Sequence, residues 1–236
     1  MRILALETAT GIGSVALRDG DRTVERDFDP RGQGAVAALH HLLTEEKVRP
    51  GEIDAFAVSI GPGSFTGIRI GVSVAQGFCR ATTARAVPVG TLEGLAWAGH
   101  ESDWGVPGMV LLPSVDARRG EVYAAVYRAR GSGRDPARLW GPEVVSCAEL
   151  AERLVGLSAD DTEGVLLGDG GGLLAPLLPG RWAAPAALAR PRAGVIARVA
   201  AAKLTAGEWV PPDRLVPEYV RKSDAESRRE RRPATD

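Results

Sequence analysis

The segment from residue 55 to residue 79 constrains the fold more than any other part of the chain. It reads AFAVSIGPGSFTGIRIGVSVAQGFC. It begins with an apolar, strand-like run and ends with small and apolar residues at helical spacing, from about Ile68 to Arg80. The glycine-rich loop between them, Gly61 to Gly67, predicts an abrupt change from strand to helix. The segment therefore predicts an α/β protein.

Hydrophobic periodicity predicts further strands and helices on both sides of this segment. We expect three strands within residues 1–30, a helix over 35–47, a strand over 84–89 and a helix over 91–99. The Asp-Gly pair at 19–20 favours a hairpin between the second and third strands, because primed turns need a positive φ angle.

The chain divides into two parts at residues 100–108, where glycine, proline and acidic residues interrupt every periodicity. The β-β-β-α-β order of the first part begins again at residue 109, in a shorter form. We therefore expect an N-terminal lobe at 1–104 and a smaller lobe at 105–220, facing each other across a cleft. Residues 221–236 form a basic tail, predicted to be disordered, with contact to RNA phosphates as the alternative.

The composition excludes several classes of protein. With 44% hydrophobic and 25% charged residues, the chain has the balance of a folded domain. Its net charge of −1 gives no overall field that would attract nucleic acid or an anionic membrane. Two cysteines are too few for a disulfide framework, and no stretch approaches the roughly 18 apolar residues of a membrane span. We therefore expect a cytoplasmic protein with no membrane contact.

The glycine-rich loop is a candidate anion or nucleotide site, because a helix N-terminus offers free N–H groups and the positive end of a dipole. It has neither the G-K-[ST] sequence of a P-loop nor the G-x-G-x-x-G spacing of a dinucleotide site. A tight turn without a ligand is an equally good interpretation. The candidate contact residues are Gly61, Gly63, Ser64, Phe65 and Thr66.

The helix after the loop carries small residues four positions apart, so one of its faces can come close to another element. Tight internal packing and a subunit interface both account for this pattern. The candidate interface residues are Gly67, Ile68, Gly71, Val72, Ala75 and Phe78.

The sequence offers no clear catalytic or metal-binding constellation. His40 and His41 are adjacent and His100 is distant, so no H-x-x-x-H pair projects two imidazoles towards one metal. No G-x-S-x-G elbow is present. Four carboxylates are expected near strand ends, where they could bind magnesium or act as a base, although most such residues only face solvent. They are Glu7, Asp116, Glu121 and Asp169.

Several sequence blocks together resemble the TsaB family, also called YeaZ, of tRNA threonylcarbamoyladenosine biosynthesis. The most specific block is GPGSFTGIRIGVSVAQGF at 61–78, followed by PVGTL at 88–92. Further blocks are ILALETAT at 3–10, DARRGEVYAAVY at 116–127 and PEYVR at 217–221. The resemblance thus covers nearly the whole chain.

The resemblance implies a two-lobed actin/Hsp70/sugar-kinase type of fold. It also implies a non-catalytic subunit, without cofactor or metal, that binds and activates the threonylcarbamoyltransferase TsaD, with the ATPase TsaE. Contact with tRNA would then occur through the complex, and the isolated chain could form a homodimer. For the helix face around Gly71, the resemblance favours a subunit interface over internal packing. Relatives often have Asp where this chain has Glu7, which argues against a magnesium role there.

Two other functions fit the same fold. A nucleotide-binding phosphotransferase would use the cleft with the loops at 61–67 and 168–172. Against it, the second lobe is small for closing over ATP. The second is a protease. Against it, the sequence lacks the metal pair or the nucleophile constellation that a protease would need.

Overall fold

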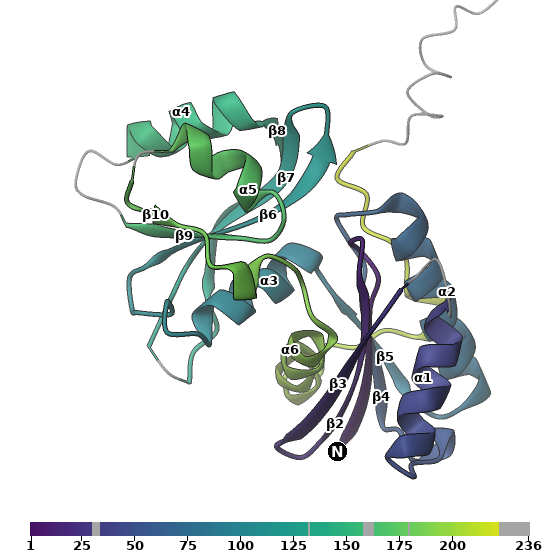
Figure 1. Ribbon diagram of the computed structural model, residues 1–236. Helices are drawn as coiled ribbons and strands as arrows, with labels where there is room; N and C mark the ends of the chain where they lie inside the picture. The colour runs from purple at the N-terminus through teal and green to yellow at the C-terminus, as the bar shows by residue number, and fades with distance from the viewer. Residues whose placement is uncertain (30–33, 132, 158–162, 179, 222–236) are drawn as a thin grey trace, which may run out of the picture.

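The structure is a computed structural model that describes residues 1–29, 34–131, 133–157, 163–178 and 180–221. The tail predicted to be disordered lies, from residue 222 on, outside the described residues. The predicted order of strands and helices is confirmed in both halves, and two five-stranded sheets form the centres of two lobes (Figure 1).

The first sheet has the strand order β3-β2-β1-β4-β5. Its strands are β1 (Arg2–Glu7), β2 (Gly13–Asp19), β3 (Arg22–Phe28), β4 (Ala55–Ser59) and β5 (Arg85–Val89). The first three are antiparallel, and β4 and β5 run parallel to β1. Gly20 has a φ angle of +58° in the turn between β2 and β3, which confirms the predicted hairpin. Helices α1 (Gly34–Glu45) and α2 (Phe65–Ala81) cover the outer face of this sheet (Figure 1).

The second sheet has the equivalent order β10-β9-β6-β7-β8. Its strands are β6 (Val110–Arg118), β7 (Glu121–Arg128), β8 (Ala137–Ser146), β9 (Gly164–Leu167) and β10 (Trp182–Ala183). Helices α4 (Cys147–Leu157) and α5 (Gly171–Leu174) pack on its outer face. Short 3-10 turns lie at Pro50–Glu52, Ala175–Leu177, Ala186–Leu188 and Pro212–Arg214.

The two remaining helices, α3 (Thr91–His100) and α6 (Ala193–Thr205), lie between the sheets (Figure 1). α3 follows the first sheet in the chain but packs on the second, with Leu95 against Leu111 and Leu167. α6 follows the second sheet but packs on the first. The expected ranges 1–104 and 105–220 therefore separate the two sheets but not these two helices.

α6 can occupy this central position because small and apolar residues cover nearly all of its sides, as expected of a helix buried between two layers. Its buried residues are Ala193, Gly194, Val195, Ile196, Ala197, Val199, Ala200 and Leu204. Gly94 lets α3 come close to α6, since a Cβ atom at this position would lie 2.8 Å from Cδ1 of Ile196. Within the described residues, no helix combines the length and the apolar character needed to cross a bilayer.

Replacing Ser14 by Ala should destabilise the protein. The buried Ser14 hydroxyl accepts a hydrogen bond from the Ala193 backbone N–H, at 2.9 Å, at the start of α6. Without it this buried donor loses its partner, which should lower the free energy of unfolding by about 1–3 kcal/mol. Urea denaturation measures the change. The exposed Ser73→Ala on α2 is the matched control, and an equal effect in both variants would contradict the proposed role of this bond.

Candidate functional site

The small-residue face of α2 packs against the first sheet. Ile68, Val72 and Ala75 are almost completely buried in the outer core of the first lobe. At Gly71, a Cβ atom would lie 2.5 Å from the Thr8 hydroxyl and 3.2 Å from Val58 Cγ2. The spacing thus serves close packing of a helix on a sheet.

The partner contact predicted for this face stays a prediction. Four of its residues, Ile68, Gly71, Val72 and Ala75, are buried within the chain itself. A Cβ atom at Gly67 would lie 2.0 Å from the Thr8 carbonyl oxygen, and the half-buried Phe78 ring packs on Phe56, with centroids 5.1 Å apart. Sequence periodicity identified the small-residue face of α2 but not the element against which this face packs.

The opposite face of α2 is exposed and carries an aromatic and cationic cluster. The Arg69 guanidinium lies over the Phe65 ring, 3.8 Å from its centroid. Its Nε donates a hydrogen bond to the Tyr219 hydroxyl at 2.7 Å, and the Tyr219 and Phe65 rings are 5.4 Å apart. Phe65, Ile70 and Tyr219 are 41%, 42% and 45% exposed. Together with Arg69 they form what we call the α2 surface cluster.

The glycine-rich loop uses its backbone groups within the protein. Ser64 caps α2 by accepting a hydrogen bond from the Gly67 N–H at 3.2 Å, while its own N–H donates to the Ala9 carbonyl oxygen at 2.7 Å. Gly63 has a φ angle of +155°, and a Cβ atom there would lie 2.4 Å from that same oxygen. These contacts favour the tight-turn interpretation over an anion site. Phe65 and Thr66 are exposed at the start of α2, and Gly61 is buried beneath the Glu218 backbone.

The four candidate carboxylates do not form one site. Asp169 accepts a hydrogen bond from the Asp116 backbone N–H at 3.0 Å, and Asp116 pairs with Arg118. Glu121 instead forms an ion pair with Arg221. Glu7 is fully buried at the end of β1, on the first sheet.

The second glycine loop also serves packing. A Cβ atom at Gly168, where φ is +85°, would lie 2.1 Å from the Ser114 carbonyl oxygen of β6. At Gly170, it would lie 2.8 Å from the Ser114 hydroxyl. Among the described residues, no group of three or more His, Cys, Asp or Glu side chains could hold a metal ion.

Comparison with known proteins identifies the relatives of this chain. Residues 33–158, just over half of the chain, match the sequence profile of the family TsaD: tRNA N6-adenosine threonylcarbamoyltransferase. The tRNA threonylcarbamoyladenosine biosynthesis protein TsaB of Escherichia coli K12 is 38% identical over 148 residues, which cover 61% of this chain and 60% of that protein. TsaB of Bacillus subtilis is 32% identical over 135 residues, 54% of this chain and 56% of that protein. The chain thus spans little more than half the length of these curated relatives.

A solved structure of YeaZ from Pseudomonas aeruginosa extends the similarity to the whole fold. It covers 92% of this chain and 99% of its own, with a TM-score of 0.79 and 29% identity. The chain belongs to the TsaB/YeaZ family. The two-lobed α/β fold of the actin/Hsp70/sugar-kinase type, expected from the sequence, is thereby confirmed.

The internal position of the Gly71 face in this TsaB/YeaZ chain can be tested with two glycines of one helix. Gly71→Ala should lower the free energy of unfolding by about 1–3 kcal/mol, because the added methyl group overlaps Thr8. Gly77→Ala, the matched control, has open space and should raise it by up to about 1 kcal/mol through helix propensity. Urea denaturation of both variants measures the two changes in the free energy of unfolding. A neutral Gly71→Ala would show that the face is not tightly packed.

Glu7 should make the stability of this TsaB/YeaZ chain depend on pH. Burial raises the pKa of Glu7 from 4.5 to about 7, although the Ser59 hydroxyl and the Ala9 N–H favour the charged form. The folded protein therefore holds this proton more tightly than the unfolded chain does. The associated stability is complete below pH 4.5 and is lost as the pH rises to about 7.

Glu7→Gln should remove this loss, because the amide remains neutral at every pH. The variant should gain stability over the natural protein as the pH rises, by at most about 3 kcal/mol at pH 8. Urea denaturation at pH 5 and pH 8 measures the gain, with the exposed Glu208→Gln as control. If the free energies of unfolding of the natural protein and of Glu7→Gln changed equally between pH 5 and pH 8, the raised pKa of Glu7 would be contradicted.

Proposed function

We propose that this chain is a non-catalytic subunit of the tRNA N6-threonylcarbamoyladenosine machinery, which binds and activates the threonylcarbamoyltransferase TsaD together with TsaE. The family assignment supports the pathway, since its curated relatives are named biosynthesis proteins for this modified nucleoside. The match to the sequence profile of the transferase itself supports a partner of related shape. Related lobes present similar ridges and grooves, which favours pairing between them.

The α2 surface cluster is the observation that carries this proposal. Aromatic residues and arginine are enriched where protein interfaces bury their central contacts. Here two aromatic rings and the Arg69 guanidinium are already held together, so little side-chain freedom would be lost on binding. Ile70, the residue after Arg69 on the same helix, is exposed as well. We therefore place the partner contact on this face of α2, and a homodimer of the isolated chain would use the same surface.

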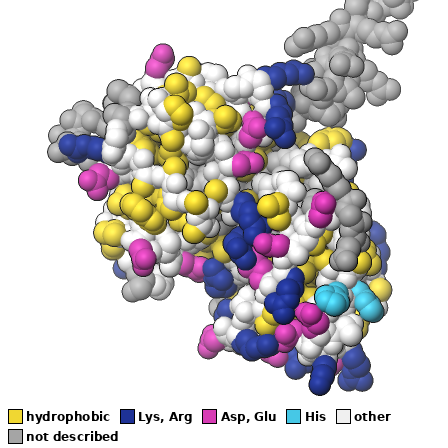
Figure 2. Space-filling view, viewed as in Figure 1, with side chains coloured by type: hydrophobic (Ala, Val, Ile, Leu, Met, Phe, Trp, Pro, Cys, Tyr) yellow, Lys and Arg dark blue, Asp and Glu magenta, His cyan; other side chains and the backbone are white. Residues whose placement is uncertain are grey.

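In this proposal the subunit has no catalytic metal of its own. His40 and His41 are exposed on α1, where cyan side chains mark the surface of the first lobe (Figure 2), while His100 ends α3. His100 bonds the Arg134 carbonyl oxygen through Nε2, at 2.9 Å. Contact with tRNA would come through the assembled complex.

The proposal is tested by mixing the purified chain with TsaD and TsaE from the same organism. Size-exclusion chromatography with light scattering should show a complex with TsaD. A tRNA threonylcarbamoylation assay should show activity for the mixture and none for this chain alone. Modification of tRNA by the chain alone would refute the non-catalytic role, and failure to associate with TsaD would refute the partnership.

Within this complex, Ile70→Asp should weaken the affinity for TsaD by at least about 30-fold, because it places a charge at the centre of an apolar contact. The matched control is Leu173→Asp, since Leu173 is equally exposed, at 42%, but lies in the second lobe. Isothermal titration calorimetry measures both affinities, and circular dichroism checks that both variants fold. Equal affinities for the two variants would exclude the α2 surface cluster as the contact.

A further inference from the structure

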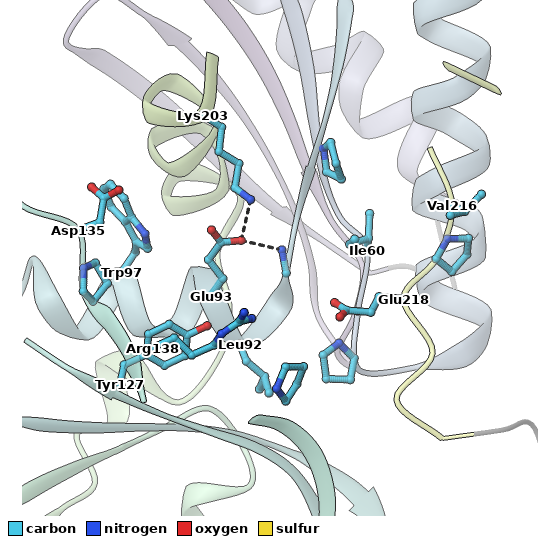
Figure 3. Close-up of a pocket in the computed structure, with 17 residues that line it drawn as sticks. Ile60, Leu92, Glu93, Trp97, Tyr127, Asp135, Arg138, Lys203, Val216 and Glu218 are labelled. Carbon is cyan, nitrogen blue, oxygen red and sulfur yellow. Dashed lines mark hydrogen bonds and ion pairs between the residues drawn. The ribbon is translucent and has the colours of Figure 1, made fainter. Parts of the chain in front are cut away.

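A cavity of about 770 Å³ lies between the two lobes, apart from the α2 surface cluster (Figure 3). The ends of β4 and β5 and the segment 216–218 form one side of it, and α3, β7 and β8 contribute the rest together with Lys203 of α6. Sites for small molecules usually have volumes of about 300–1,000 Å³ and often lie between lobes. The cavity therefore has the size and the place of a ligand site.

The α3 and β8 side of the cavity carries a fixed set of charges. Glu93 accepts a hydrogen bond from the Gly90 N–H at 3.2 Å and forms an ion pair with the Lys203 ammonium at 3.0 Å. The Arg138 guanidinium of β8 points into the cavity, which the Tyr127 side chain also lines (Figure 3). Since a guanidinium has five N–H donors, Arg138 keeps donors for a ligand.

The opposite side presents one carboxylate, that of Glu218. Its backbone is held in place, because the Glu218 N–H donates to the Ile60 carbonyl oxygen at 2.8 Å. Its side chain points into the cavity (Figure 3) and has no hydrogen-bond or ion-pair partner in the part of the chain that the structure describes. Arg138 and Glu218 thus face the same space without pairing.

The remaining walls are mainly apolar. Leu92 and Trp97 of α3 contribute side chains, and several prolines contribute rigid surface without a backbone N–H donor. The lining prolines are Pro62, Pro88, Pro136, Pro142 and Pro217. Polar recognition in this cavity therefore depends on the charged side chains.

We propose that the cavity binds a free α-amino acid with an apolar side chain. Its carboxylate would bind Arg138, its ammonium group would bind Glu218, and its side chain would pack on Leu92 and Trp97. A ligand with only negative charge would meet Glu93 and Glu218, and one with only positive charge would meet Arg138 and Lys203. A zwitterion satisfies both sides at once.

Titration of the full chain by two-dimensional NMR tests the charge requirement, with L-leucine as the probe. Two derivatives each lack one charge, N-acetyl-L-leucine the ammonium group and L-leucinamide the carboxylate. Each should bind at least about tenfold more weakly than L-leucine, because each loses one charge-assisted hydrogen bond. Glycine should also bind more weakly, since it lacks the apolar side chain. No binding of L-leucine at millimolar concentration would refute the proposal.

Two variants then assign the charges. Arg138→Gln and Glu218→Gln should each weaken L-leucine binding about tenfold. Arg138→Gln should leave the binding of L-leucinamide unchanged, and Glu218→Gln should leave that of N-acetyl-L-leucine unchanged. The controls Arg85→Gln and Glu208→Gln alter exposed residues that do not line the cavity. Equal affinity in all variants would refute the site, whatever the outcome of the TsaD experiments.

Discussion

The contact between α3 and α6 is the constraint on which the two-lobed arrangement depends. Each helix crosses from its own half of the chain to the sheet of the other, and the two meet where Gly94 leaves room for Ile196. Ion pairs border the contact, Glu93 with Lys203 at 3.0 Å and Glu101 with Arg198 at 2.7 Å. Because each helix is packed on one sheet and touches the other helix, movement of one lobe would disturb both cores.

This crossing also determines the path of the chain after α6. The helix ends beside the first sheet, and Val210 then bridges to Ala86 of β5. Farther on, Gln76 of α2 donates a hydrogen bond to the Leu215 carbonyl oxygen at 2.8 Å. The chain finally reaches the second lobe, where Arg221 pairs with Glu121 of β7. The segment 210–221 therefore fastens α2 and the first sheet to the second lobe.

Local sequence patterns predicted the elements of this fold well but not their partners. The helix expected over 68–80 is observed as α2 at Phe65–Ala81, and the small-residue stripe correctly indicated close packing. Periodicity gives the direction of a face relative to its own helix, however, and not what lies opposite it. The sequence predicted a cleft between the lobes but not its lining, because Glu218 and Arg138 are 80 positions apart and face the same space only in the folded chain. The PEYVR block at 217–221 was the one sequence signal for this segment.

Within that block, two adjacent residues serve different surfaces. In an extended chain successive side chains point to opposite sides. Glu218 accordingly faces the cavity between the lobes, while Tyr219 bonds Arg69 in the α2 surface cluster. The backbone between them is anchored on one side by Ile60 and on the other by the Arg221 ion pair. Glu218 and Tyr219 thus place the cavity and the α2 surface cluster on either side of one short segment.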